Sequence, residues 1–157
     1  MKNNSKHLDK HLSRVLAVQF LYSRLVNERD NLETTPFEPN SILEEMEEKK
    51  YDNSLYVSLV EGTLEHKDSI DEVITELAPE YPISDLNPIN LIILKVSIVE
   101  AFINQTTPAP IVIDEAIELK KDINPDESSS SFINGVLGAI LKNEKILSKL
   151  SNLKNIE

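Results

Sequence analysis

The chain contains no cysteine and no tryptophan, and only three of its 157 residues are glycine. Without cysteine, the sequence can form no disulfide, no thiolate metal site and no cysteine nucleophile. A low glycine content together with 40% apolar residues is typical of a compact helical protein and not of a disordered one. At this length the chain fits one domain, or two small subdomains that share a core.

Long apolar segments are also missing. The longest, residues 89–103, is interrupted by four polar or charged side chains, so it falls short of the ~20 apolar residues that a membrane span requires. It predicts instead a buried core helix at the centre of the C-terminal half. Lys95 and Glu100 would lie where this helix reaches water or an internal partner. The N-terminal residues 1–7 lack the apolar centre of a signal peptide. These observations predict a cytoplasmic protein that does not bind membranes.

Positive charge is scarce, with 16 basic residues against 27 acidic ones and a formal net charge of −11. A polyanion is repelled by such a chain except at a local basic patch, so the charge disfavours general nucleic-acid binding and argues against DNA as a partner. An acidic chain instead suits a basic protein partner.

Apolar residues recur at helical spacing along most of the chain, and no segment alternates as a strand would. The sequence therefore predicts an all-α fold. The spacing indicates seven helices, over residues 8–28, 41–49, 52–64, 70–77, 87–103, 110–120 and 131–147. Two prolines, Pro79 and Pro82, bracket a connector. We therefore expect an N-terminal helical subdomain over residues 1–78 and a C-terminal helical subdomain with a polar tail over residues 79–157.

Residues 131–137, Ser-Phe-Ile-Asn-Gly-Val-Leu, place an aromatic, an amide and a glycine inside an apolar helix. Glycine in a helix interior costs about 0.5–1 kcal/mol relative to alanine, so a tolerated glycine needs a packing or recognition reason. This segment resembles the signature of the NusB family of bacterial transcription antitermination factors. Further segments resemble that family, in the family's order: RVLAVQFLY at 14–22, YVSLVEGTL at 56–64, ILKVSIVE at 93–100 and PIVIDEAIELK at 110–120.

The resemblance implies a fold of two small packed helical bundles. It also implies binding of boxA-type single-stranded leader RNA as a heterodimer with the ribosomal protein NusE. That complex would join the RNA polymerase elongation complex with other Nus factors and support ribosomal RNA transcription. We expect no metal site, because His7 and His11, four residues apart, have no third ligand nearby. We expect no cofactor either, because the sequence shows no glycine-rich phosphate loop, no nucleophile elbow and no assembled catalytic set. The sequence therefore predicts a protein without enzymatic activity.

The family's RNA-binding segments correspond here to two groups of residues. The expected contacts are Lys10, His11, Arg14, Gln19 and Tyr22 in the first helix and Phe132, Asn134 and Gly135 in the last. Lys10 and Arg14 would pair with phosphates, and two such contacts would give a log–log salt slope of about −1.4 on single-stranded RNA. Tyr22 or Phe132 would stack on a base. The alternatives are a solvated first turn, core aromatics, and packing of another helix against Gly135 and Gly138.

Two other functions remain open. The runner-up is a helical protein–protein interaction module that has lost most RNA binding, because the basic run of the first helix is thin. A similar helical domain also precedes the catalytic domain of some ribosomal RNA cytosine methyltransferases, but this chain carries no glycine-rich cofactor loop. The adjacent carboxylates Asp114 and Glu115 suit the first turn of a helix, where they would complement the macrodipole.

Overall fold

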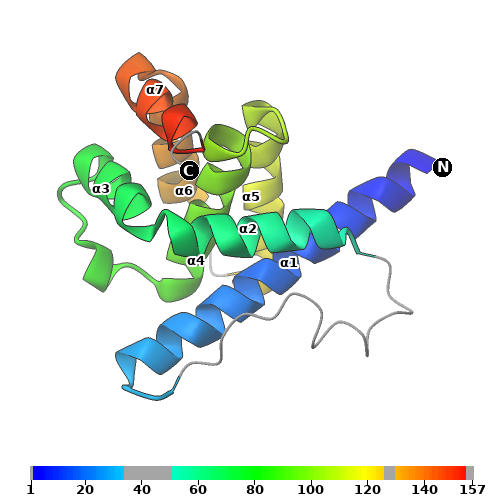
Figure 1. The fold of residues 1–157 in the computed structure, drawn as a ribbon, viewed down its shortest axis with the longest axis horizontal. Helices are drawn as coiled ribbons and strands as arrows, with labels where there is room; N and C mark the ends of the chain where they lie inside the picture. The colour runs from blue at the N-terminus through cyan, green and yellow to red at the C-terminus, as the bar shows by residue number, and fades with distance from the viewer. Residues whose placement is uncertain (1, 34–50, 126–129, 155–157) are drawn as a thin grey trace.

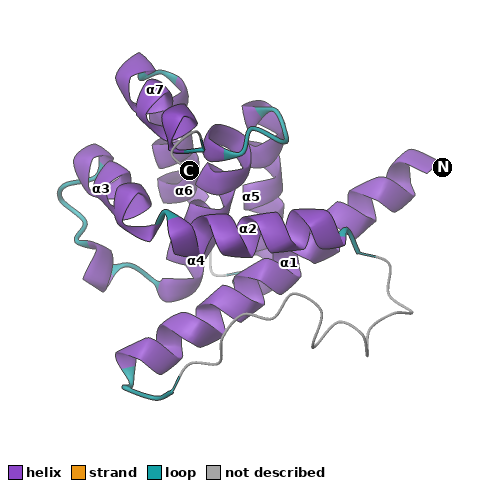
Figure 2. Ribbon diagram, viewed as in Figure 1, coloured by secondary structure: helices purple, strands orange, loops and turns teal. Residues whose placement is uncertain are grey.

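The computed structural model describes residues 2–33, 51–125 and 130–154, with side chains from residue 7 onward. Every regular element in these ranges is helical, which confirms the predicted all-α class (Figure 2). The elements are α1 (Lys2–Arg29), α2 (Asn53–Glu65), α3 (Lys67–Leu77), the 3₁₀ helix η2 (Ile83–Asp85), α4 (Pro88–Ile98), the π-helical η3 (Val99–Ile103), α5 (Ala109–Ile123), α6 (Ser130–Leu141) and α7 (Glu144–Leu153). The predicted helix over residues 41–49 lies outside the described residues.

Helix boundaries follow local capping chemistry where the sequence supplies it. The Asn87 side chain accepts hydrogen bonds from the backbone N–H groups of Ile89 and Asn90, and Pro88 occupies the first helical position of α4. Both features suit a helix start because the first N–H groups lack partners within the helix. The predicted single helix over residues 131–147 is wrong, since Asn143 accepts a hydrogen bond from the Ile146 N–H and starts α7.

The buried apolar side chains form one continuous cluster, and α4 lies at its centre. All residues from Asn90 to Ile103 are buried, as the near-continuous apolar pattern predicted. Helices α1, α2, α5 and α6 all pack against α4. In Figure 1, α1 is a long diagonal helix whose N-terminal end extends beyond the other helices. The division into subdomains at residue 78 stays a prediction.

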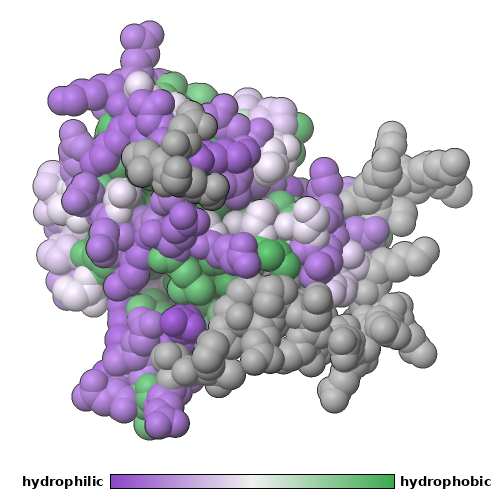
Figure 3. Space-filling view, in the orientation of Figure 1, coloured by the Kyte–Doolittle hydropathy of each residue, from purple (hydrophilic) through white to green (hydrophobic). Residues whose placement is uncertain are grey.

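The last turn of α4 widens into η3, and α2 packs closely against it. Gly62 of α2 makes this approach possible, because a Cβ at that position would lie 2.6 Å from Cγ1 of Val99. The close packing fixes η3, which carries the buried Glu100, relative to α2. None of the helices in the described ranges is long and apolar enough to cross a membrane. The face in Figure 3 is mostly hydrophilic, with smaller apolar areas between the helices.

Candidate nucleic-acid interface

Arg14, one of the expected RNA contacts, lies in a buried ion-pair cluster. Its Nε and Nη2 donate hydrogen bonds of 2.8 and 2.6 Å to the two carboxylate oxygens of Glu100, and its Nη1 donates one of 3.3 Å to Oε2 of Glu115. Burial lowers the pKa of Arg14, but the hydrogen bond to Glu100 and the charges of Glu100 and Glu115 outweigh burial and raise it. The guanidinium therefore stays charged and ties α1 to η3 and α5.

This geometry bears on the predicted role of Arg14 in RNA binding. The residue is 3% exposed, and its planar donors are shared between two carboxylates. A phosphate contact would require this cluster to open and would leave buried carboxylates without their cation, which is unfavourable. The structure therefore gives Arg14 a positioning role, and direct contact with RNA stays a prediction.

The other expected residues of α1 differ in exposure. Lys10 and Gln19 are exposed, and Tyr22 is partly buried. His11 is also partly buried and faces α5: its Nε2 lies 2.7 Å from Oδ2 of Asp122, and its Nδ1 lies 3.4 Å from Oε2 of Glu115. Lys10 is thus the accessible cation among the predicted contacts of α1.

The interpretation of Asp114 and Glu115 as first-turn carboxylates is wrong. Helix α5 begins at Ala109 with Pro108 at its N-cap, so both residues lie in the second turn. Asp114 is exposed, whereas Glu115 is 5% exposed and pairs with residues of α1. Besides Arg14 and His11, its carboxylate lies 3.3 Å from Nδ1 of His7. Glu115 is therefore structural through a contact between helices and not through capping.

The predicted contacts of α6 divide between two surroundings. Asn134 and Gly135 are exposed, whereas Phe132 is partly buried and packs edge-on against Tyr81, with ring centroids 5.6 Å apart. A Cβ added at Gly135 or Gly138 would meet no atom within 4 Å. Within the described residues, therefore, no other helix packs against these glycines, and Gly135 leaves open space at the surface.

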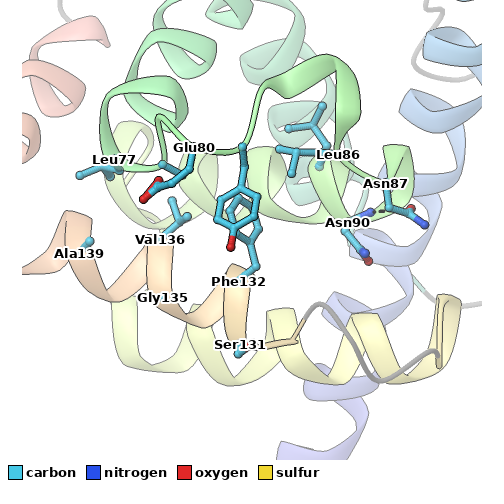
Figure 4. A pocket seen from close by; sticks show the side chains of 13 residues that line it. Leu77, Glu80, Leu86, Asn87, Asn90, Ser131, Phe132, Gly135, Val136 and Ala139 are labelled. Carbon is cyan, nitrogen blue, oxygen red and sulfur yellow. Dashed lines mark hydrogen bonds between the residues drawn. The ribbon is translucent and has the colours of Figure 1, made fainter.

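A cavity of about 480 Å³ lies between α6, the end of α3 and the connector to α4. Apolar and aromatic side chains line it together with the amides of Asn87 and Asn90 (Figure 4). Glu80 is the charged residue of this lining, which includes neither lysine nor arginine. Phe132 and Gly135 line the cavity and Asn134 does not. The residues of the 131–137 segment therefore lie on more than one surface of the protein.

Helix α5 connects the two groups of predicted residues, because it packs against both α1 and α6. Its C-terminal end is held by polar contacts: Nζ of the buried Lys120 donates to the Asn124 carbonyl at 3.0 Å, and Nδ2 of Asn124 donates to Oδ1 of Asn90 at 3.2 Å. The expectation that the charged residues of the central helix reach internal partners or water is confirmed by Glu100 with Arg14. Nζ of Lys95 likewise lies 2.8 Å from Oδ1 of Asp71.

Sequence reasoning missed three residues of these surroundings, namely Glu80, Tyr81 and Asp122. Tyr81 and Glu80 follow α3 in a connector, where helical periodicity gives no information about direction. Asp122 lies 111 residues from His11 in sequence, so no local pattern could have paired them. In the parts of the chain that the structure describes, no group of three or more histidine, aspartate or glutamate side chains could hold a metal ion.

Comparison with known proteins gives one consistent family. The family model described as the NusB family matches residues 11–142. A transcription antitermination protein NusB of Roseiflexus castenholzii is 32% identical over 146 residues, covering 89% of this chain and 96% of that protein. The protein of the same name from Nitratiruptor sp. is 35% identical over 136 residues, covering 87% and 94%. A solved structure of T. maritima NusB superposes with a TM-score of 0.68 at 25% identity, covering 89% and 96%.

Proposed function

The chain belongs to the NusB family, and from this premise we propose that it binds boxA-type single-stranded RNA as a heterodimer with NusE. In this proposal it acts by binding and not by catalysis. The complex joins the RNA polymerase elongation complex with other Nus factors and supports transcription of ribosomal RNA. The observation that carries the proposal is the family match over residues 11–142, which includes all the predicted RNA contacts except Lys10, the residue directly before it.

The exposure of particular side chains supports the RNA part of the proposal. Lys10 and Gln19 on α1, and Asn134 on α6, present a cation and two amides to solvent. A lysine pairs with phosphate, and an amide both donates to and accepts from a base edge. A Cβ at Gly135 would meet no atom within 4 Å, so the surface of α6 is also open at that residue. In this proposal Arg14 holds α1 in place.

The charge distribution supports the partner. The net charge of −11 suits association with a basic protein and speeds it. The cavity beside α6 combines Glu80 with the aromatic rings of Tyr81 and Phe132, a chemistry that suits a cationic side chain of a protein. A basic partner would also supply positive charge for RNA that this chain lacks.

Fluorescence anisotropy of a labelled boxA-type RNA tests the proposal, with this chain titrated alone and with purified NusE. We expect weak binding by the chain alone and tight binding by the heterodimer. Lys10→Gln and Asn134→Ala should each weaken RNA binding about threefold or more, because each removes one phosphate or base contact. Lys145→Gln and Asn152→Ala, which change exposed residues of α7, are matched controls and should leave binding unchanged.

The interaction-module alternative draws on the burial of Arg14, which leaves Lys10 as the accessible cation among the predicted contacts of α1. It predicts that the heterodimer forms while the labelled RNA never joins it. Size-exclusion chromatography of the two proteins with and without RNA separates these outcomes. If neither NusE nor RNA binds, both functions are wrong for this chain.

A further inference from the structure

His11 stands between two carboxylates of α5. Its Nε2 lies 2.7 Å from Oδ2 of Asp122, and its Nδ1 lies 3.4 Å from Oε2 of Glu115. The side chain is 21% exposed, so solvent reaches the ring although both nitrogens face protein oxygens. These contacts join the N-terminal half of α1 to two separate turns of α5.

The hydrogen-bonding capacity of imidazole decides which form of the ring fits this place. A neutral imidazole has one N–H donor and one acceptor nitrogen, and an ionised carboxylate can only accept. The neutral ring therefore satisfies one carboxylate and turns an acceptor nitrogen toward the other. The doubly protonated ring donates to both carboxylates, so it links α1 to α5 through two hydrogen bonds.

Acidic side chains outnumber basic ones around the ring. Glu100, Glu115 and Asp122 supply three carboxylates, whereas Arg14 supplies one guanidinium. The negative charge of Asp52, at the N-cap of α2, also acts on Arg14.

No cation of α4 contributes to this balance, because Lys95 pairs with Asp71. On α1 itself, Lys10 is exposed, and His7 is 60% exposed and 3.3 Å from Glu115. His11 is therefore the partly buried group of the cluster that can add a positive charge.

We propose that His11 is a positioning residue: in its doubly protonated form it holds the N-terminal half of α1 on Asp122 and Glu115, and it does not itself contact RNA. Deprotonation of the ring removes one of the two hydrogen bonds from His11 to α5. This inference rests on the proposed RNA-binding function, since the turn that it holds presents Lys10. RNA binding should then be tighter with the doubly protonated ring than with the neutral ring.

Amide hydrogen exchange on the protein alone tests the positioning without RNA. Protection factors of the α1 amides over residues 7–14 are compared between about pH 6 and about pH 8. We expect protection about two- to fivefold higher at the lower pH, the range of a partly exposed ion pair. His11→Gln and Asp122→Asn should remove this difference, whereas Asp114→Asn, an exposed carboxylate of the same helix, should keep it. Protection of α1 that His11→Gln leaves unchanged at both pH values would overturn the proposal.

RNA anisotropy of the heterodimer at the same two pH values tests the link to function. Wild-type protein should bind RNA about two- to fivefold more tightly at the lower pH. His11→Gln should bind RNA at both pH values with the weaker affinity that the wild type shows at the higher pH. His11→Arg supplies N–H donors that stay protonated at both pH values. It should therefore bind RNA at both with the tighter affinity that the wild type shows at the lower pH.

Two results would overturn the link. The first is a wild-type RNA affinity that does not change with pH while the protection of α1 does. The second is a loss of affinity in His11→Gln with full protection of α1, because it would show that His11 contacts RNA directly. If wild-type protein binds no RNA at all, the proposed function fails, while the exchange measurement still decides the positioning.

Discussion

Arg14 is buried and donates three hydrogen bonds to carboxylates, and its removal should therefore destabilise the fold. We expect Arg14→Met to lower the free energy of unfolding by about 3–5 kcal/mol, because Glu100 would be left buried without its cation. Urea denaturation followed by circular dichroism measures the change. Arg29→Met, at an exposed residue in the last turn of the same helix, is the matched control and should change stability by less than about 0.5 kcal/mol.

The double variant Arg14→Met with Glu100→Met separates the cost of an unpaired charge from the contribution of the pair. Replacing both partners by apolar side chains of similar size is often close to neutral, so the double variant should recover the part of the loss that Glu100 causes. Glu115 still lacks Arg14 in the double variant and accounts for the remainder. A double variant as unstable as the single one would show that the unpaired Glu100 carboxylate is not the cause of the loss.

Two glycines in α2 and α6 should respond in opposite directions to the same substitution. At Gly62, a Cβ would lie 2.6 Å from Cγ1 of Val99, and such overpacking costs about 1–3 kcal/mol. At Gly135, a Cβ would meet nothing within 4 Å, so Gly135→Ala should stabilise the helix by about 0.5–1 kcal/mol. Thermal unfolding of both variants checks the signs; a stabilised Gly62→Ala would contradict the close packing of α2 on η3.

The same comparison shows what the sequence could predict about single residues. Gly135 drew attention because it lies in a recognisable motif, whereas Gly62 lies in an ordinary amphipathic pattern and its importance depends on Val99 of another helix. Similarly, a local pattern can mark Arg14 and His11 as possible cations. It cannot show that both face carboxylates of distant segments, because those contacts depend on how the helices cross.

At the scale of the elements, helix starts were predictable where a cap and a proline coincide, as at Asn87-Pro88. The break between α6 and α7 was missed because apolar residues continue on both sides of it, at Leu141 and Ile146, and hide the change of direction. Asn143 was the available signal, since asparagine favours N-cap positions. The π-helical widening at Val99–Ile103 had no comparable signal, because that segment is apolar on nearly every side.

The cap at Asn143 gives a prediction for α7. Asn143→Ala should destabilise the protein by about 1 kcal/mol, because the Ile146 N–H loses the side-chain acceptor 3.1 Å away. Chemical denaturation measures the loss, and Asn152→Ala, at an exposed position within α7, is the control. Asn143→Asp keeps an acceptor and should retain the stability. If Asn143→Asp were as unstable as Asn143→Ala, the cap would not be the reason.

At the scale of the whole molecule, the sequence predicted the helical class and the central position of residues 89–103, because both follow from periodicity and composition. It also identified the family, because the motifs occur in order along most of the chain. The arrangement of the candidate RNA-binding residues did not follow in the same way. Their exposure depends on which carboxylates of α5 and η3 face α1, and a net charge of −11 gives no position for any of them.

The burial of Arg14 also changes the expected salt dependence of RNA binding. Two phosphate contacts, from Lys10 and Arg14, would give a log–log slope of about −1.4, whereas Lys10 alone gives about −0.7. We therefore expect the isolated chain to show the shallower slope in anisotropy titrations across salt concentrations. Lys10→Gln should bring it close to zero, while Lys145→Gln should not change it. Addition of NusE should steepen the slope, since a basic partner brings further phosphate contacts. A slope of −1.4 or steeper for the chain alone would instead indicate that the Arg14 cluster opens when RNA binds.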